Sequence, residues 1–220
     1  MEFITVFKEA TPLLLRGLGT TIGVSLISIA IGMFLGLVTC FMGRSKNPVF
    51  KWISAVYVWC VRGTPMIVQA LVVFFGIPFI TGIKAESFYA GIITLSLNAG
   101  AYMSEIFRGG IQAVSIGQIE AARSLGLSSF KTMLKIVLPQ AFKMSIPAFV
   151  NQFIITIKDS SILSIIGLAE LVNMGQVYIG ATYIYFPVYT TIALYYLAVI
   201  SVLMIISKII EKKFSYDKKS

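Results

Sequence analysis

The sequence has no histidine, only two cysteines, and charged residues at only 12% of its 220 positions. Histidine is the commonest general base and metal ligand at neutral pH, so its absence removes the simplest catalytic and metal sites. Cys40 and Cys60 both lie in apolar segments, which gives little support to a disulfide or a thiolate metal site. The carboxylates do not cluster, and no nucleophile–base pair stands out. The sequence therefore predicts no catalytic residue and no metal-binding residue, and it argues against an enzyme.

The sequence also lacks the G-x-x-x-x-G-K-[ST] phosphate loop, which is the usual backbone cradle for a nucleotide. We therefore expect the chain to bind no cofactor of its own. If ATP drives its activity, then ATP and Mg²⁺ must bind to a separate partner subunit.

Long apolar runs are abundant instead. Hydrophobic residues make up 57% of the chain, and neither Val24–Met42 nor Phe186–Ser207 contains a charged residue. About 20 helical residues cross a hydrocarbon layer roughly 30 Å thick, whereas a soluble domain would need far more surface charge. We predict an all-α polytopic membrane protein in the lipid bilayer, with a single domain over residues 1–220. Its five transmembrane helices are expected at residues 13–42, 52–80, 87–107, 142–157 and 186–209.

The basic residues lie mostly at the ends of these runs, so the net charge of +9 does not indicate a nucleic-acid partner. Lysine and arginine are enriched in the cytoplasmic loops of membrane proteins. Five crossings place twelve basic residues on one side and four on the other. The twelve are Arg44, Lys46, Lys51, Arg108, Arg123, Lys131, Lys135, Lys208, Lys212, Lys213, Lys218 and Lys219; the four are Lys8, Arg16, Lys84 and Lys158. We therefore predict an outside N-terminus and a cytoplasmic C-terminus.

Small and helix-breaking residues mark two further features of the predicted helices. Gly19/Gly23 and Gly32/Gly36 have the small-xxx-small spacing that allows helices to pack closely. We favour packing within one subunit over a dimer contact for both pairs. Pro65 should kink or break the second helix and free backbone carbonyls, which a membrane protein tolerates only beside protein or a water-lined cavity.

A polar stretch follows the third predicted helix on the predicted cytoplasmic side. We expect a short helix at about residues 118–128, with small or apolar contact positions among polar ones. A helix of fewer than three turns is not stable alone in water, so it must be supported by its own subunit, by a partner, or by both. The alternative is an amphipathic helix lying on the lipid headgroups. The lack of large aromatic residues on its apolar face argues against that alternative.

This stretch resembles the cytoplasmic docking loop of permease subunits of binding-protein-dependent ABC importers. The shared pattern is Glu120-Ala121-Ala122, then Gly126, then Ile136-Val137-Leu138-Pro139. The resemblance implies the transmembrane domain of a type I ABC importer, in which the short helix is a coupling helix that sits in a groove of the ATP-binding subunit. It assigns ATPase docking to Glu120, Ala121, Ala122, Leu125 and Gly126.

Further motifs look like those of the polar amino-acid branch of that family. They are Leu18-Gly19-Thr20-Thr21, Arg62-Gly63-Thr64-Pro65, Glu105-Ile106-Phe107-Arg108-Gly109-Gly110-Ile111 and Lys158-Asp159-Ser160-Ser161. The resemblance implies a multi-pass protein of a bacterial-type cell membrane. It also implies a dimer with a second copy or a paralogue, two ATP-binding subunits, an extracellular solute-binding protein and an amino-acid substrate. A secondary transporter or channel driven by an ion gradient is the alternative, and it leaves the docking pattern unexplained.

Polar side chains inside a membrane are costly and usually face a cavity or one another. The candidate substrate contacts share helix faces or follow them: Asn98 and Glu105; Arg62, Thr64 and Gln69; Gln152 and Asp159, with Ser160 and Ser161 after them. A carboxylate from Glu105 or Asp159 would bind the ammonium group of an amino acid. Arg62, Thr64, Ser160 or freed backbone groups would bind its carboxylate. Because a second carboxylate would suit a basic side chain, we favour arginine, lysine or histidine as the substrate.

Simpler explanations exist for these polar residues. Glu105 and Arg108 are three positions apart and can pair on one helix, and Lys158 can screen Asp159. Glu105 and Asp159 should also lie at different depths, since a helix rises about 1.5 Å per residue. One ligand could reach both only if the fourth helix bends, for example at Pro147, or if residues 158–171 fold back. Residues 160–172 are interpreted either as a short helix that covers the cavity from outside or as a surface loop.

Overall fold

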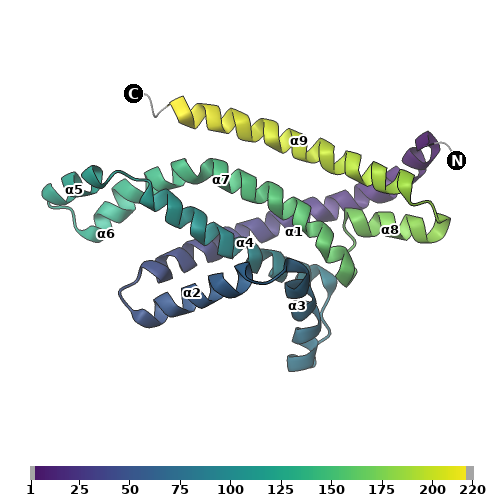
Figure 1. Ribbon diagram of the computed structural model, residues 1–220, viewed down its shortest axis with the longest axis horizontal. Helices are drawn as coiled ribbons and strands as arrows, with labels where there is room; N and C mark the ends of the chain where they lie inside the picture. The colour runs from purple at the N-terminus through teal and green to yellow at the C-terminus, as the bar shows by residue number, and fades with distance from the viewer. Residues whose placement is uncertain (1–2, 217–220) are drawn as a thin grey trace.

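The computed structural model describes residues 3–216, and within that range it is helical with no strand. Lys218 and Lys219 from the orientation count lie outside the described residues. Figure 1 shows long helices running side by side along one axis, with α3 projecting away from them. The helices are α1 (Phe3–Arg44), α2 (Pro48–Arg62), α3 (Met66–Thr81), α4 (Ser87–Gln112), α5 (Ile116–Ser124), α6 (Ser129–Thr132), α7 (Leu138–Asp159), α8 (Leu171–Thr182) and α9 (Phe186–Tyr216).

Two short non-α segments join these helices. A π-helical turn, η1 (Met133–Val137), precedes α7, and a 3₁₀ helix, η2 (Ser160–Ile166), follows it. The π turn falls just before Pro139, which has no N–H to donate and whose ring crowds the carbonyl four residues back. Widening the helix by one residue relieves that conflict, as π-bulges commonly do.

Helices lie at all five predicted ranges, but their bounds differ from the predicted ones. Three stretches are long and apolar enough to cross a membrane alone, namely Phe3–Arg44, Ser129–Ile166 and Phe186–Ile210. The predicted 52–80 span is two helices, α2 and α3, bent by 108° at the intervening residues. The break follows the expectation for Pro65. The number of crossings stays a prediction.

The first helix starts ten residues earlier than predicted. Helix α1 continues through Lys8, Glu9 and Pro12. Val6, Ala10 and Leu14 are fully buried, in a core cluster with residues of α8 and α9. Tertiary packing therefore outweighs the local signal in this first part of the chain.

Close packing of α1 on α4 forms the rigid centre of the fold. A Cβ added at Gly32 would lie 2.8 Å from the Cβ of Ala99, and one at Gly36 would press on the Cβ of Met103. This pair therefore packs within the subunit, which is the favoured prediction. Gly19 and Gly23 do not pack closely within the subunit, contrary to the favoured prediction, because an added Cβ would meet no atom within 4 Å at either position.

The segment after α7 folds back into the protein. Leu163, Ile166 and Leu168 are buried in a core cluster with residues of α1, α3 and α4, and Gly167 turns the chain with φ +75°. Glu170 is also fully buried at the start of α8. The surface-loop interpretation of this segment is therefore wrong, whereas the fold-back is observed. Pro147 lies inside an uninterrupted α7.

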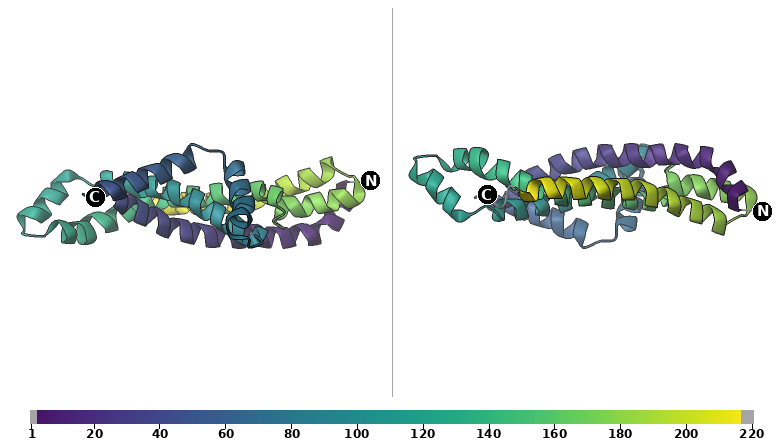
Figure 2. Two further views of the ribbon diagram at one scale, coloured as in Figure 1. Left: turned by 90° about the horizontal axis from the view of Figure 1, so that it is seen from below. Right: turned by 90° about the horizontal axis from the view of Figure 1, so that it is seen from above.

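The views from below and above show a flattened molecule with α5 and α6 at one end and α8 at the other (Figure 2). Helix α2 lies on one broad side of the slab and α1 on the opposite side, whereas α3 runs across the thickness of the slab.

Candidate functional site

A side-chain amide repairs the break between α2 and α3. Pro65 has no N–H, so the carbonyl of Val61, four residues earlier, lacks its helical donor. The Nε2 of Gln69 donates instead to the oxygen of Val61 at 2.7 Å, and also to the backbone and hydroxyl oxygens of Thr64, both at 3.0 Å. The Thr64 hydroxyl in turn donates to the carbonyl of Cys60 at 2.8 Å. Hydrogen bonds from within the protein therefore satisfy the carbonyls of Cys60, Val61 and Thr64 at the break.

Asn98 connects this repaired break to α4. Its Nδ2 donates to the Oε1 of Gln69 at 3.1 Å, and its side chain is nearly buried. Three predicted substrate contacts, Thr64, Gln69 and Asn98, thus form one hydrogen-bonded network. The sequence spacing placed Asn98 on a helix face with Glu105 but gave no sign of its bond to Gln69.

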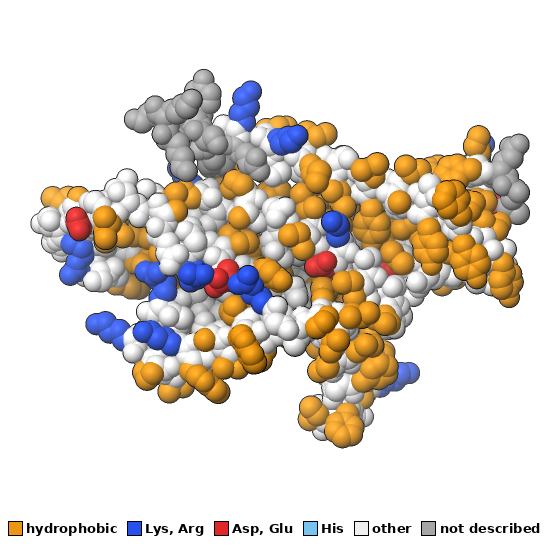
Figure 3. Space-filling model, viewed as in Figure 1, with side chains coloured by type: hydrophobic (Ala, Val, Ile, Leu, Met, Phe, Trp, Pro, Cys, Tyr) orange, Lys and Arg blue, Asp and Glu red, His pale blue; other side chains and the backbone are white. Residues whose placement is uncertain are grey.

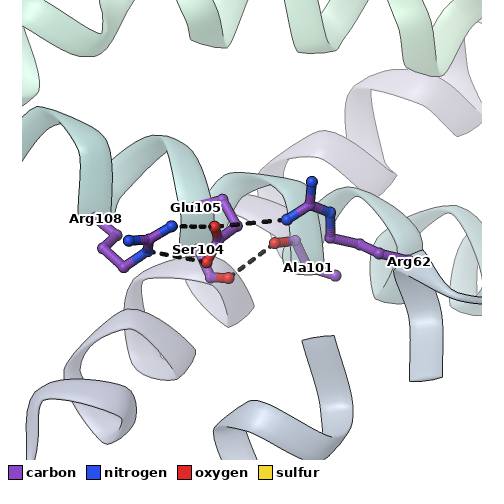
Figure 4. Close-up of polar contacts among 5 residues, drawn as sticks. All are labelled: Arg62, Ala101, Ser104, Glu105 and Arg108. Carbon is purple, nitrogen blue, oxygen red and sulfur yellow. Dashed lines mark hydrogen bonds and ion pairs between the residues drawn. The ribbon is translucent and has the colours of Figure 1, made fainter. Parts of the chain in front are cut away.

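Glu105 lies between two guanidinium groups in the half of α4 nearer α5 (Figure 4). Arg108 contacts both of its carboxylate oxygens, at 2.5 and 3.1 Å, and Arg62 lies 3.5 Å away. The Arg62 guanidinium also stacks 5.3 Å above the ring of Tyr102. Glu105 therefore joins α2 to α4, and the pairing with Arg108 that offered a simpler explanation is present. A carboxylate held this way has little capacity left for a ligand's ammonium group.

The remaining predicted contacts lie on α7 and η2. Gln152 and Ser160 are buried, and Asp159 and Ser161 are half-buried. Ser160 and Ser161 donate to the carbonyls of Ile157 and Lys158 at 2.8 and 2.6 Å. These hydroxyls close the last turn of their own helix.

The fold-back brings η2 near the break. A pocket of about 600 Å³ is lined by Pro65, Met66 and Ile67 on one side and by Ile162, Ser164, Ile165 and Gln176 on the other. The start of α3 and η2 are therefore neighbours, although 95 residues of sequence separate Ile67 from Ile162. Ligand contact by any of the nine predicted residues stays a prediction.

Glu170 is a buried acid that the sequence reasoning did not select. Its carboxylate accepts hydrogen bonds from the backbone N–H groups of Val172 and Asn173, at 3.0 and 2.7 Å, and from the hydroxyl of Tyr196 at 3.2 Å. The next backbone N–H, that of Leu171, donates to the hydroxyl of Thr21. A lone acid at the head of an apolar helix was the available signal.

The predicted docking segment forms α5 and the turn after it, at one end of the molecule (Figure 1). Ala122 is buried against the chain, whereas Glu120 and Ala121 are exposed and Leu125 is 84% exposed. Gly126 has φ +82°, and a Cβ there would meet no atom within 4 Å. The turn therefore needs a glycine for its backbone and presents an open surface.

The structure has the features of a polytopic membrane transport protein. They are the apolar helices, the broken helix whose freed carbonyls are satisfied inside the protein, and the polar helix at one end.

The family can be named from comparison with known proteins. Residues 28–216 match the family described as "Binding-protein-dependent transport system inner membrane component", and the chain belongs to this family. The predicted resemblance to permease subunits of ABC importers is thereby confirmed. Members are multi-pass inner-membrane transport subunits, not enzymes, and the family implies ATP-binding and solute-binding partner proteins.

Individual relatives align with nearly the whole chain. An arginine transport system permease protein, ArtQ, of Bacillus subtilis is 39% identical over 92% of both chains. The glutamine transport system permease protein GlnP of Escherichia coli is 33% identical over 93% of this chain and 94% of its own. A solved amino-acid ABC transporter with histidines is 36% identical, with a TM-score of 0.92 over 97% of this chain and 99% of its own. The fold alone is shared with the MetNI methionine transporter, at 19% identity and a TM-score of 0.79 over 93% of this chain and 97% of its own.

Proposed function

We propose that this chain forms the translocation pathway of an ATP-driven importer of polar amino acids. It would cross the membrane five times, with the N-terminus outside, and dimerise with itself or a paralogue. Two ATP-binding subunits, which hold the ATP and Mg²⁺, would dock at α5 in the cytoplasm, and an extracellular solute-binding protein would deliver the amino acid.

The observation that carries this proposal is the surface of α5 and its following turn. Leu125 is 84% exposed and Ile116 is 71% exposed, although the segment lies where basic residues predict the cytoplasm. Exposed apolar side chains beside an open left-handed glycine form a surface that a partner protein can approach closely. The names of the relatives, which include arginine and glutamine permeases, support an amino-acid cargo.

The preference for a basic amino acid as substrate rested on two acids, Glu105 and Asp159, and now depends on Asp159 alone. Glu105 is paired with Arg62 and Arg108, so a basic side chain would have to bind Asp159. The pocket beside η2 offers Ser164 and Gln176 as polar groups and no charge in its lining. We keep the basic amino acids as the first choice for the substrate, and an uncharged amide side chain is the alternative that this lining favours.

The docking assignment can be tested with matched acid substitutions at two exposed aliphatic residues. Leu125→Asp places a charge on the proposed docking surface, and Ile83→Asp places the same charge on a 67% exposed residue of the α3–α4 connection. We expect Leu125→Asp to abolish co-purification of the ATP-binding subunit and ATP-dependent uptake, and Ile83→Asp to retain both. A bulky residue at Gly126 should act like Leu125→Asp. If docking and uptake survive Leu125→Asp, the docking assignment is wrong. Uptake by the chain alone in ATP-free vesicles would instead favour an ion-gradient-driven transporter or channel.

A further inference from the structure

A groove of about 670 Å³ lies between the C-terminal end of α1, helix α2 and the later half of α4. Four basic side chains line it, namely Arg44, Lys51, Arg62 and Arg108, and within the described part of the chain its only acidic lining residue is Glu105. Figure 3 shows basic side chains on both sides of an acidic one on this face of the molecule.

The basic side chains of the groove outnumber its acid. Glu105 is shared by Arg62 and Arg108, whereas Arg44 and Lys51 form no ion pair with any acid whose side chain the structure describes. Arg44 is also the last residue of α1. The groove therefore holds two guanidinium groups that share the Glu105 carboxylate. It also holds two further cations, Arg44 and Lys51, for which no such partner is described.

The groove runs from the helix break to the predicted cytoplasmic surface. Arg62 ends α2 at the break, and Lys51 lies eleven residues earlier on the same helix, which corresponds to about 16 Å along the helix axis. Enrichment of basic residues in cytoplasmic loops accounts for Arg44 and Lys51. It does not account for Arg62, which lies at the other end of α2, beside the break.

We propose that this groove is an oxyanion site on the cytoplasmic side of the break, and that it receives the carboxylate of the amino acid as the cargo leaves the pathway. This inference rests on the proposed function. Guanidinium and ammonium groups in a partly enclosed groove bind a carboxylate through charge-assisted hydrogen bonds. Arg62 links the predicted pathway to the groove, and Arg44 and Lys51 supply the unpaired charge.

The test uses the assembled, nucleotide-free complex in nanodiscs of phosphatidylcholine. The probe is whichever of L-arginine, L-glutamine and L-histidine the wild-type complex takes up in proteoliposomes, together with its α-carboxamide, which lacks the negative charge. The variant is Arg44→Gln/Lys51→Gln. The control is Lys46→Gln, which removes a charge from the same connection without lining the groove.

We expect the double substitution to weaken equilibrium binding of the amino acid about tenfold or more, the effect of losing at least one charge-assisted hydrogen bond. Binding of the carboxamide should be weak and unchanged by the substitution, and Lys46→Gln should behave like the wild type. Equal binding of the amino acid by the wild type and the double variant, with uptake intact in the wild type, would overturn the groove assignment alone.

Two other results would overturn the proposal in different ways. If the double substitution acts only in nanodiscs that contain phosphatidylglycerol, and acts equally on amino acid and carboxamide, the site belongs to a lipid phosphate. If the complex takes up none of the three amino acids, the proposed function fails and the role of the groove fails with it.

Discussion

Gln69 should be the most sensitive polar residue at the helix break, because one side chain satisfies groups on three segments. In Gln69→Leu the volume is nearly kept, but the carbonyl of Val61 loses its donor and the Nδ2 of Asn98 loses its acceptor. The backbone and hydroxyl oxygens of Thr64 also lose a donor, but they are exposed and water can replace it. The substitution therefore leaves two poorly hydrated groups without a partner.

The expected cost follows from those two groups. A buried polar group left unsatisfied costs about 1–3 kcal/mol. Because both bonds are only partly buried, we expect Gln69→Leu to destabilise the protein by about 2–3 kcal/mol. Asn98→Leu leaves only the Oε1 of Gln69 unpaired and should cost about 1 kcal/mol. Thr64→Val touches only exposed partners and should stay within about 0.5 kcal/mol of the wild type.

Thermal unfolding of the purified protein in detergent measures these effects. For a chain of this length about 2–3 kcal/mol corresponds to a melting temperature lowered by roughly 5–10 °C. The double variant Gln69→Leu/Asn98→Leu should be less destabilised than the sum of the single variants, since each removes the partner that the other leaves unpaired. Additive effects of the two would refute the bond between Gln69 and Asn98, and a Gln69→Leu protein as stable as Thr64→Val would refute the claim that Gln69 replaces the missing N–H of Pro65.

Five further substitutions probe three other contacts. Gly36→Val should separate α1 from α4, because the added Cβ would press on Met103 and lie 2.9 Å from the oxygen of Gly100. We expect a sharply lower yield of folded protein in size-exclusion chromatography. The control Gly23→Ala, on the same helix, meets nothing within 4 Å, and its stability should be unchanged or higher by up to about 1 kcal/mol. Glu170→Gln should lower stability by about 1 kcal/mol, because it weakens the cap of α8. Glu170→Leu should lower it by about 3 kcal/mol or more, because the N–H groups of Val172 and Asn173 and the Tyr196 hydroxyl lose their acceptor. Equal melting temperatures for the two variants would contradict a capping role. Glu105→Gln should change stability by less than about 1 kcal/mol, since its partners Arg62 and Arg108 are exposed, yet alter uptake; uptake unchanged from the wild type would remove the ion cluster from the pathway.

The helical fold and most of its long helices follow from the apolar runs, because a backbone in lipid must satisfy its hydrogen bonds internally. Pro65 predicts the break between α2 and α3, because a proline inside a helix has no N–H to donate to the carbonyl four residues earlier. The fold-back of residues 160–170 could not be read this way, since its burial depends on Val24, Ala70 and Leu95, which are distant in sequence. The bond between Gln69 and Asn98 is equally non-local, so spacing along each helix could place both residues on a face but not in contact.

The route from the docking helix to the break is short and consists of few parts. Helix α4 carries both Asn98 and Glu105, ends at Gln112, and is followed by α5 from Ile116. The Nε2 of Gln140 on α7 donates to the Oε1 of Gln118 on α5 at 2.5 Å. We infer that a partner moving α5 would move α4 and α7 with it, and therefore shift Glu105 relative to Arg62 on α2. The Arg62–Glu105 ion pair at 3.5 Å is one contact between α2 and α4 that such a movement would change.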